Sequence, residues 1–434
     1  MSRVDWDVIV IGAGPAGSAA ATFLARMGRK VALFEKEHFP RFHIGESLLP
    51  IAMPILESLG LDLANAPYAL KKEGALIMAE SLGMQHRISF EETLPGSYPY
   101  AYQVDRDAFD FDLLNIAIQA GARAFMGQAV KKLEELEDRV RITTAEGNFS
   151  CRYLVDATGQ NRLMTRQHGS RKFVRGMGSC ATFTQYSGVT SPRARETFKT
   201  GDILLMLTAE TSWSWLIPLP GNRLSVGQVL RDGMPIEKPD IAYARLLAGS
   251  PVLREILAGA ERIHPIRRCS DFSYYTSPAN TRRMCSVGDA HAFLDPVFSS
   301  GVSLGLFAAQ SMAGELEPHL KDDSPLDLST HHAKMKRGYL SFERVIERYY
   351  RAGWAFTTFF LTPKSPELVV QLNTIFSGDV WREDNDLQNK MLRAKPRTVS
   401  YVAEIPKSSN PKAPPHAYPD AAITECLSNH KQGP

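Results

Sequence analysis

The chain has 434 residues, of which 44% are hydrophobic and 22% are charged, and this ordinary globular composition excludes a disordered, collagen-like or coiled-coil chain. With 50 Lys and Arg against 47 Asp and Glu, the net charge of +3 is too small to attract nucleic acid or anionic lipid. No nucleic-acid partner is therefore expected.

The N-terminus lacks the features of a signal peptide, and no apolar run approaches the roughly 20 residues that span a bilayer. The five cysteines are odd in number, scattered and without Cys-x-x-Cys spacing, which is typical of reduced thiols and not of disulfides or zinc ligands. We therefore expect a cytoplasmic protein with no membrane span and no metal site.

The first 36 residues are expected to form one βαβ unit. Residues 5–11 are β-rich and almost continuously apolar, as in a parallel strand buried on both faces. Residues 15–28 predict a helix of small residues that Gly28 closes, and residues 30–36 predict the next strand. The chain therefore opens a Rossmann-type α/β domain.

The turn between the first strand and the helix has the G-x-G-x-x-G pattern of dinucleotide-binding proteins. Gly12 permits a tight turn, Gly14 lets the backbone approach a pyrophosphate, and Gly17 lets the helix pack closely on the strand. Glu35 ends the second strand, where its carboxylate can accept hydrogen bonds from an adenosine ribose. The pattern in this context predicts a dinucleotide cofactor.

Later segments return to the same sheet or build a second one. Residues 151–159 and 284–290 are apolar and end near glycine, which predicts two more strands of the first sheet and hence a discontinuous domain. Alternating segments within 176–230 predict an antiparallel sheet. Residues 302–317 and 333–360 are expected to be helical.

The distal motifs resemble those of the flavoprotein monooxygenase superfamily. Arg106 in QVDRDAFD and Gly288-Asp289 in SVGDAHAF match that superfamily's mid-chain arginine and late Gly-Asp motif. The resemblance implies that the cofactor is FAD, with a ribityl hydroxyl on Asp289.

Within the superfamily, the chain is most similar to flavin-dependent halogenases of the branch that acts on pyrrole or phenol rings. FPRFHIGESLLP (39–50) resembles the flavin-side loop of that branch, and LKKEGA (70–75) resembles its lysine region. TSWSWLIPLP contains the W-x-W-x-I-P fingerprint, and DPVFSSGVSLG (295–305) resembles the late loop that contacts flavin and halide.

This resemblance implies a domain plan and a set of contacts. We expect a discontinuous FAD-binding domain at 1–175 and 270–330, a substrate-binding sheet domain at 176–269, a helical C-terminal region at 331–403 and a mobile proline-rich tail at 404–434. The expected FAD contacts are Gly12, Gly14, Ala16, Gly17, Glu35, Lys36, Arg41, Ser47, Arg106, Asp289, Pro296, Gly301 and Val302.

The resemblance further implies that reduced FAD and O2 convert chloride or bromide into hypohalous acid, which Lys72 passes to the substrate. Lys72 either donates a hydrogen bond to the hypohalous acid or becomes a haloamine. Ser300 and Gly301, with backbone N–H groups at a helix start, are the expected halide site. Trp213, Trp215 and Ile217 alternate along a predicted strand, so all three point to one face and are expected to fill a core. The resemblance implies a second role for them: together with Pro218 they form a wall between the flavin and the substrate.

Two motifs of related enzymes are absent from this sequence, and their absence narrows the range of expected substrates and electron donors. The glutamate that tryptophan halogenases carry in the late loop is absent from DPVFSSG, which favours an already electron-rich ring over free indole. The resemblance to the pyrrole and phenol branch implies that this ring is held on an acyl or peptidyl carrier protein. Asp156-Ala157-Thr158-Gly159 lacks the Asp-Gly motif of NADPH-dependent hydroxylases, which favours a separate flavin reductase. The alternatives are a hydroxylase or a geranylgeranyl-reductase-like oxidoreductase of the same fold, and a flavin-binding carrier-protein partner without catalysis.

Overall fold

A computed structural model describes residues 4–209, 212–351, 353–361, 364–397 and 399–404. The described residues up to Ala403 form one compact unit. Beyond Glu404, the tail predicted at 404–434 lies outside the described residues. The domain boundaries stay predictions.

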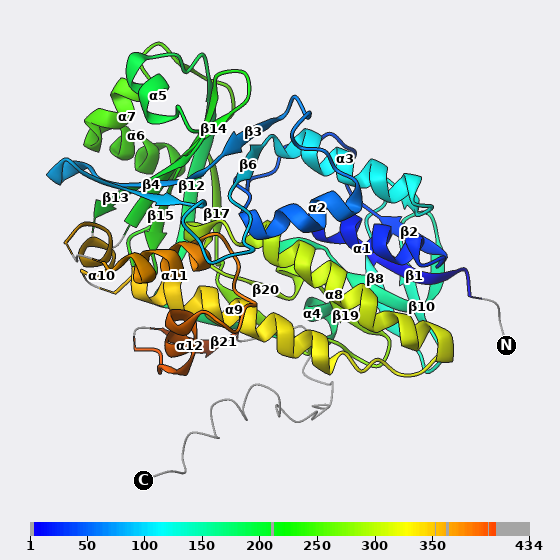
Figure 1. The fold of residues 1–434 in the computed structure, drawn as a ribbon. Coiled ribbons are helices and arrows are strands. Elements are labelled where there is room, and N and C mark those ends of the chain that lie inside the picture. Colours follow the sequence, from blue (N-terminus) through cyan, green and yellow to red (C-terminus); the bar gives the residue numbers. More distant parts are fainter. Residues whose placement is uncertain (1–3, 210–211, 352, 362–363, 398, 405–434) are drawn as a thin grey trace, which may run out of the picture. The chain divides into compact units, whose positions relative to one another are not determined.

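In the described residues, a seven-stranded sheet holds the strands predicted at 5–11, 30–36, 151–159 and 284–290 (Figure 1). Its parallel strands are β7 (Arg123–Phe125), β2 (Val31–Phe34), β1 (Trp6–Ile11), β10 (Asn148–Asp156) and β19 (Met284–Ser286). Strands β9 (Val140–Thr143) and β8 (Lys132–Glu135) extend it antiparallel. Because β1 and β2 are covered on both faces, nearly all of their residues are buried.

A second sheet contains the strands predicted within 176–230. Its members are β16 (Glu261–Arg262), β17 (Arg267–Ser270), β12 (Gly178–Ser187), β15 (Arg223–Arg231), β14 (Ser212–Leu219), β13 (Ile203–Ala209), β4 (Gly74–Ala79) and β5 (Met84–Ser89). The hairpin β4–β5 joins through a parallel pairing of β4 with β13 that the sequence analysis did not foresee.

Two smaller sheets complete the described strands. One pairs β3 (Ala69–Lys72) with β6 (Ala101–Val104). The other contains β20 (Ala292–Phe293), β18 (Tyr274–Ser277), β11 (Ser170–Arg175) and β21 (Ser400–Ala403).

The helices of the described residues gather mainly around the sheets' edges and faces (Figure 1). They are α1 (Pro15–Arg26), α2 (Met53–Leu59), α3 (Arg106–Gln119), α4 (Leu163–His168), α5 (Pro192–Thr197), α6 (Pro239–Gly249), α7 (Pro251–Ile256), α8 (Gly301–Asp322), α9 (Ser329–Tyr349), α10 (Trp354–Phe356), α11 (Pro366–Phe376) and α12 (Asp386–Arg393). Helix α1 packs between α8 and α3. None of these helices is long and apolar enough to cross a membrane.

The two long C-terminal helices differ from their predicted bounds. Helix α8 starts one residue before the predicted 302–317 and continues past Pro318 to Asp322, since the buried Leu316 and Leu320 keep that turn on the core. A single helix over 333–360 is wrong: α9 ends at Tyr349, and Gly353 takes a φ of +72°, a left-handed conformation that interrupts a helix. The chain then continues as α10 and a short π-helix at Thr357–Leu361.

Strand β14 presents its tryptophans on one face, as the period-two pattern predicts. Trp213, Trp215 and Ile217 all join the main hydrophobic core, and the two indole rings lie 5.8 Å apart. A Cβ added at Gly227 on the neighbouring β15 would lie 2.2 Å from the Trp215 ring. Gly227 therefore makes room for the indole.

Candidate active site

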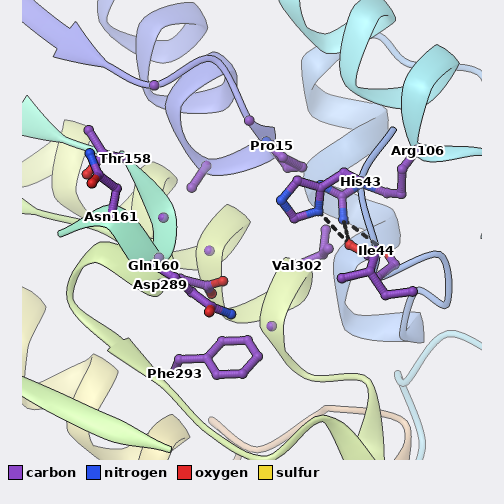
Figure 2. A pocket seen from close by; sticks show the side chains of 18 of the residues that line it. Pro15, His43, Ile44, Arg106, Thr158, Gln160, Asn161, Asp289, Phe293 and Val302 are labelled. Atoms are coloured by element: carbon purple, nitrogen blue, oxygen red, sulfur yellow. Dashed lines mark hydrogen bonds between the residues drawn. The ribbon is translucent and has the colours of Figure 1, made fainter. Parts of the chain in front are cut away.

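A cavity of about 520 Å³ lies where the carboxyl ends of β1 and β10 meet the loop after β2, the tryptophan face of β14 and the segment that leads into α8. Figure 2 shows side chains from all around it, with Pro15, Thr158, Asp289 and Phe293 on different segments of the lining. The crevice at the carboxyl ends of parallel strands is where this type of sheet binds ligands.

The glycine turn of β1 and α1 forms one wall of this cavity. Gly12 has a φ of +98°, and a Cβ there would lie 2.3 Å from the carbonyl oxygen of Ala157 after β10. A Cβ at Gly17 would lie 1.8 Å from the carbonyl oxygen of Gly12. At Gly14, by contrast, the nearest atom would be Nη2 of Arg41 at 3.8 Å. Gly12 and Gly17 are thus required by the fold, and Gly14 faces open space.

Glu35 lies just past the end of β2 on the cavity lining. Its carboxylate oxygens accept hydrogen bonds from the backbone N–H of Ala13, at 2.8 Å, and of Glu37, at 3.0 Å. The side chain is therefore held in place beside the glycine turn.

Arg106 and Asp289 approach the cavity from opposite segments (Figure 2). Arg106 pairs with Asp110 at 2.7 Å and donates to the carbonyl oxygens of Ile44 and Gly45, so it anchors the loop after β2. No hydrogen bond from the described residues reaches the Asp289 carboxylate. Its enclosure by protein raises the pKa to about 7, which leaves a poorly solvated acceptor facing the cavity.

Lys72 is buried, with 1% of its surface exposed, whereas its neighbour Lys71 is exposed. The alternation of β3 turns the two side chains to opposite sides. The Nζ of Lys72 donates to Oγ of Ser47 at 2.7 Å and lies 5.5 Å from the Phe90 ring centre. Burial lowers the Lys72 pKa to about 7, against a smaller opposing effect of Asp202.

Ser47 connects this lysine to the cavity. Ser47 lines the cavity, and Lys72 does not. The lysine therefore lies one hydrogen bond behind the cavity wall.

Glu46 is a site residue that the sequence analysis missed. Its carboxyl is 1% exposed, lines the cavity and accepts hydrogen bonds from Gln185 Nε2 at 3.1 Å and from the Gly45 N–H at 3.0 Å. Burial raises its pKa. The only signal was its place in HIGESLLP, next to Ser47, because an acidic residue in a loop is ordinarily exposed.

The face of β14 and the start of α8 close the rest of the cavity. Trp213, Trp215 and Ile217 line it, together with the partly buried thiol of Cys269, whose pKa burial raises to about 11. Helix α8 begins at Gly301, so its first N–H groups lack acceptors within the helix.

Most of the predicted FAD contacts line one cavity: Gly12, Gly14, Ala16, Glu35, Lys36, Arg41, Ser47, Arg106, Asp289, Pro296, Gly301 and Val302. Four other predicted residues are absent from the lining: Gly17, Lys72, Pro218 and Ser300. Gly17 packs under the turn, and Ser300 is buried beside the lining residues Ser299 and Gly301. The roles assigned to these residues stay predictions.

Comparison with known proteins agrees with this site. A family model described as an FAD binding domain matches residues 5–337. The chain is 30% identical over 414 residues to 1H-pyrrole-2-carbonyl-[peptidyl-carrier protein] chlorinase of Pseudomonas fluorescens, which covers 88% of this chain and 91% of that protein.

Two solved structures are similar along most of the chain. The flavin-dependent brominase Bmp2 has a TM-score of 0.78 at 25% identity and covers 89% of this chain and 97% of its own. A flavoprotein/dehydrogenase from Cytophaga hutchinsonii has a TM-score of 0.79 at 25% identity and covers 89% and 96%.

The two glycines Gly14 and Gly17 should respond differently to alanine. Gly14→Ala should leave the melting temperature close to that of the unchanged protein but weaken FAD binding roughly tenfold, since the new methyl group enters the cavity. Gly17→Ala should destabilise the fold by about 2–3 kcal/mol, because its methyl group overlaps the Gly12 carbonyl. Thermal melting and FAD titration of both variants test this, and equal loss of stability would contradict it.

The buried Lys72 should make stability depend on pH. Its pKa of about 7 in the folded state lies below the unfolded value of about 10.4, so folding releases a proton between these values and stability rises as the pH rises from about 7 to about 10. Lys72→Met should remove that rise and be more stable than the unchanged protein by on the order of 1–3 kcal/mol at about pH 6, with the gain shrinking towards pH 10.

Urea denaturation at both ends of this pH range measures the difference. Lys71→Met is the matched control, because the ammonium of Lys71 is exposed and stays hydrated in the folded protein. A gain for Lys72→Met that is the same at every pH would contradict the burial argument.

Proposed function

The chain belongs to the FAD binding domain family and is a flavin-dependent halogenase, and from this premise we propose that it halogenates an electron-rich aromatic ring, pyrrolyl or phenolic, by way of Lys72. The observation that carries the proposal is the buried Lys72, bonded to the cavity-lining Ser47. An amine in this position can receive an oxidised halogen that leaves the cavity.

The residues of the cavity fit FAD. The space in front of Gly14 and the N-terminus of α1 suit a pyrophosphate, and Glu35 is suited to a ribose. Asp289, an enclosed carboxyl with no hydrogen-bond donor among the described residues, suits a ribityl hydroxyl. When bound in reduced form, FAD supplies the activation of O2 that oxidises chloride or bromide to hypohalous acid.

The start of α8 is proposed to hold the halide. The N–H groups of the first turn of α8, which begins at Gly301, lack acceptors within the helix. Together with the helix dipole they favour a small anion there, with Ser300 as the residue before the helix. Gly301 and Ser299 line the cavity, which supports this location.

Lys72 is proposed to transfer the halogen. In one route its ammonium donates a hydrogen bond to hypohalous acid and makes the halogen more electrophilic. In the other, its neutral amine forms an N–X bond as the O–X bond breaks and water leaves; the ring carbon then takes the halogen and loses its proton. A pKa of about 7 allows both forms near neutral pH.

The tryptophan face is proposed to keep the substrate away from the flavin. Trp213, Trp215 and Ile217 stand on the cavity side of β14, with Pro218 following in the strand. In this proposal, the bulky rings direct hypohalous acid past Ser47 towards Lys72.

Two partners complete the proposal. A separate flavin reductase supplies the reduced FAD, because Asp156-Ala157-Thr158-Gly159 lacks the Asp-Gly motif of NADPH-dependent hydroxylases. A carrier protein bears the ring, as the name of the Pseudomonas fluorescens relative states for that enzyme.

We also propose a cytoplasmic location. Four cysteines of the described residues are free thiols, which supports this location.

Lys72→Met should lower the rate of ring halogenation by more than about 100-fold. The variant should still bind FAD, because Lys72 does not line the cavity. Reduced FAD, O2 and chloride or bromide are supplied, halogenated product is measured by mass spectrometry, and escaping hypohalous acid is trapped with a thioether. The variant should still release trapped acid, and Lys71→Met should behave as the unchanged enzyme. Continued halogenation by Lys72→Met would remove the lysine from the mechanism, and flavin reoxidation without any halide dependence would favour a hydroxylase.

The ring should be accepted on a carrier. A pyrrole-2-carbonyl thioester on a peptidyl carrier protein should be halogenated at least about tenfold faster than free pyrrole-2-carboxylate, and a carrier-bound phenolic acyl group is the parallel substrate. Equal rates for free and carrier-bound rings would contradict the carrier assignment and leave the halogenase assignment intact.

A further inference from the structure

A buried chain of hydrogen bonds joins three segments that are distant in the sequence. The Nε1–H of Trp213 donates to the hydroxyl of Tyr350 at 2.8 Å, and that hydroxyl donates to Oδ2 of Asp295 at 2.7 Å. The other oxygen of Asp295 accepts the backbone N–H of Val297 at 2.9 Å. Each of the three side chains is at most 2% exposed.

The two ends of this hydrogen-bond network belong to two different segments that contribute to the active-site lining. Trp213 lines the cavity from β14. Asp295 precedes Pro296, Ser299 and Gly301, which line it from the segment that leads into α8. Tyr350 follows the last residue of α9 and does not line the cavity. The Tyr350 hydroxyl, which lies outside the cavity, therefore links the tryptophan face of β14 to the segment that leads into α8, where the halide is proposed to bind.

The Tyr350 hydroxyl and the Asp295 carboxylate are closely packed by the neighbouring strand β12. A Cβ at Gly178, on β12, would lie 2.0 Å from Oδ2 of Asp295 and 2.6 Å from the hydroxyl oxygen of Tyr350. Gly178 thus allows the strand to press against the bonded pair. A hydrogen bond to a buried carboxylate is stronger than one between neutral groups, and a buried carboxylate that loses its donor is costly. Burial raises the Asp295 pKa to about 6, and the Tyr350 bond opposes that rise.

We propose that Tyr350 is a positioning residue for halogen transfer, which holds Trp213 and the segment Asp295–Gly301 together so that hypohalous acid leaves the cavity past Ser47 to Lys72 instead of escaping into solvent. This inference rests on the proposed function. Tyr350 touches neither the cavity nor Lys72, and it acts through Trp213 and Asp295. It sets the fraction of oxidised halide that reaches the ring, not the rate at which halide is oxidised.

The test compares Tyr350→Phe with Tyr349→Phe in the full-length, FAD-loaded enzyme. Tyr349 is the matched control, since its hydroxyl is also buried but makes no hydrogen bond among the described residues. Two quantities are measured per FADH2 consumed, with bromide or chloride: halogenated ring, and hypohalous acid trapped by an added thioether. For Tyr350→Phe we expect unchanged FAD content, the same sum of the two products within about twofold, and a product fraction lowered about fivefold or more. Tyr349→Phe should keep the product fraction of the unchanged enzyme.

The outcomes separate this inference from the proposed function. If the unchanged enzyme forms neither halogenated ring nor trapped acid, the proposed function fails and the inference fails with it. If it halogenates and Tyr350→Phe keeps the product fraction, or lowers both products together with FAD content, the inference alone is overturned. Should Tyr350→Phe not fold, Trp213→Phe removes the donor at the other end and leaves Tyr350 hydrogen-bonded to Asp295. Trp215→Phe is its control, because Trp215 lines the same wall but donates to Ser225 instead. A larger escape of acid in Trp213→Phe than in Trp215→Phe supports the proposal, and equal product fractions in the two variants overturn it.

Discussion

The close contact of small residues at the start of α1 is the constraint on which the site depends. Gly12 and Gly17 press the turn against the end of β10, and a Cβ at either position would overlap a backbone carbonyl. On the far side, the Cβ of Ala16 lies 3.1 Å and 3.2 Å from where side chains at Gly288 and Gly305 would begin. Because β1, β10, the segment after β19 and α8 meet through glycines and the small side chain of Ala16, these elements come close together beside the cavity. Both the glycine turn and the start of α8 then face the same space.

Much of this arrangement could be predicted from the sequence because its signals are local. The buried strands, the glycine turn and the period-two tryptophans each rest on a few consecutive residues, and the observed β1, α1 and β14 follow them. The C-terminal helix pattern was less informative: aromatic residues continue past Tyr349, but the chain turns at Gly353, where a left-handed conformation interrupts the helix.

The interactions that the sequence could not predict join distant segments. The burial of Lys72 depends on how β3 pairs with β6, and nothing in LKKEGA says which lysine points inward. Glu46 has the sequence context of an exposed loop residue, but the fold buries it. Tyr350 is separated from its hydrogen-bond partners Trp213 and Asp295 by 137 and 55 residues. Such contacts depend on tertiary packing, and a single sequence carries no signal for them.

The lining of the cavity also bears on how long the enzyme survives its own chemistry. Indoles and thiols are the side chains that electrophilic halogen attacks most readily, and Trp213, Trp215 and Cys269 all line the space where the proposed oxidant is made. The thiolate is the reactive form of cysteine, and partial burial, which raises the Cys269 pKa to about 11, keeps that sulfur protonated. A smaller share of this thiol is therefore in the thiolate form than in an exposed cysteine. Where the proposed oxidant forms, the indoles of Trp213 and Trp215 are the lining side chains left open to chlorination or bromination.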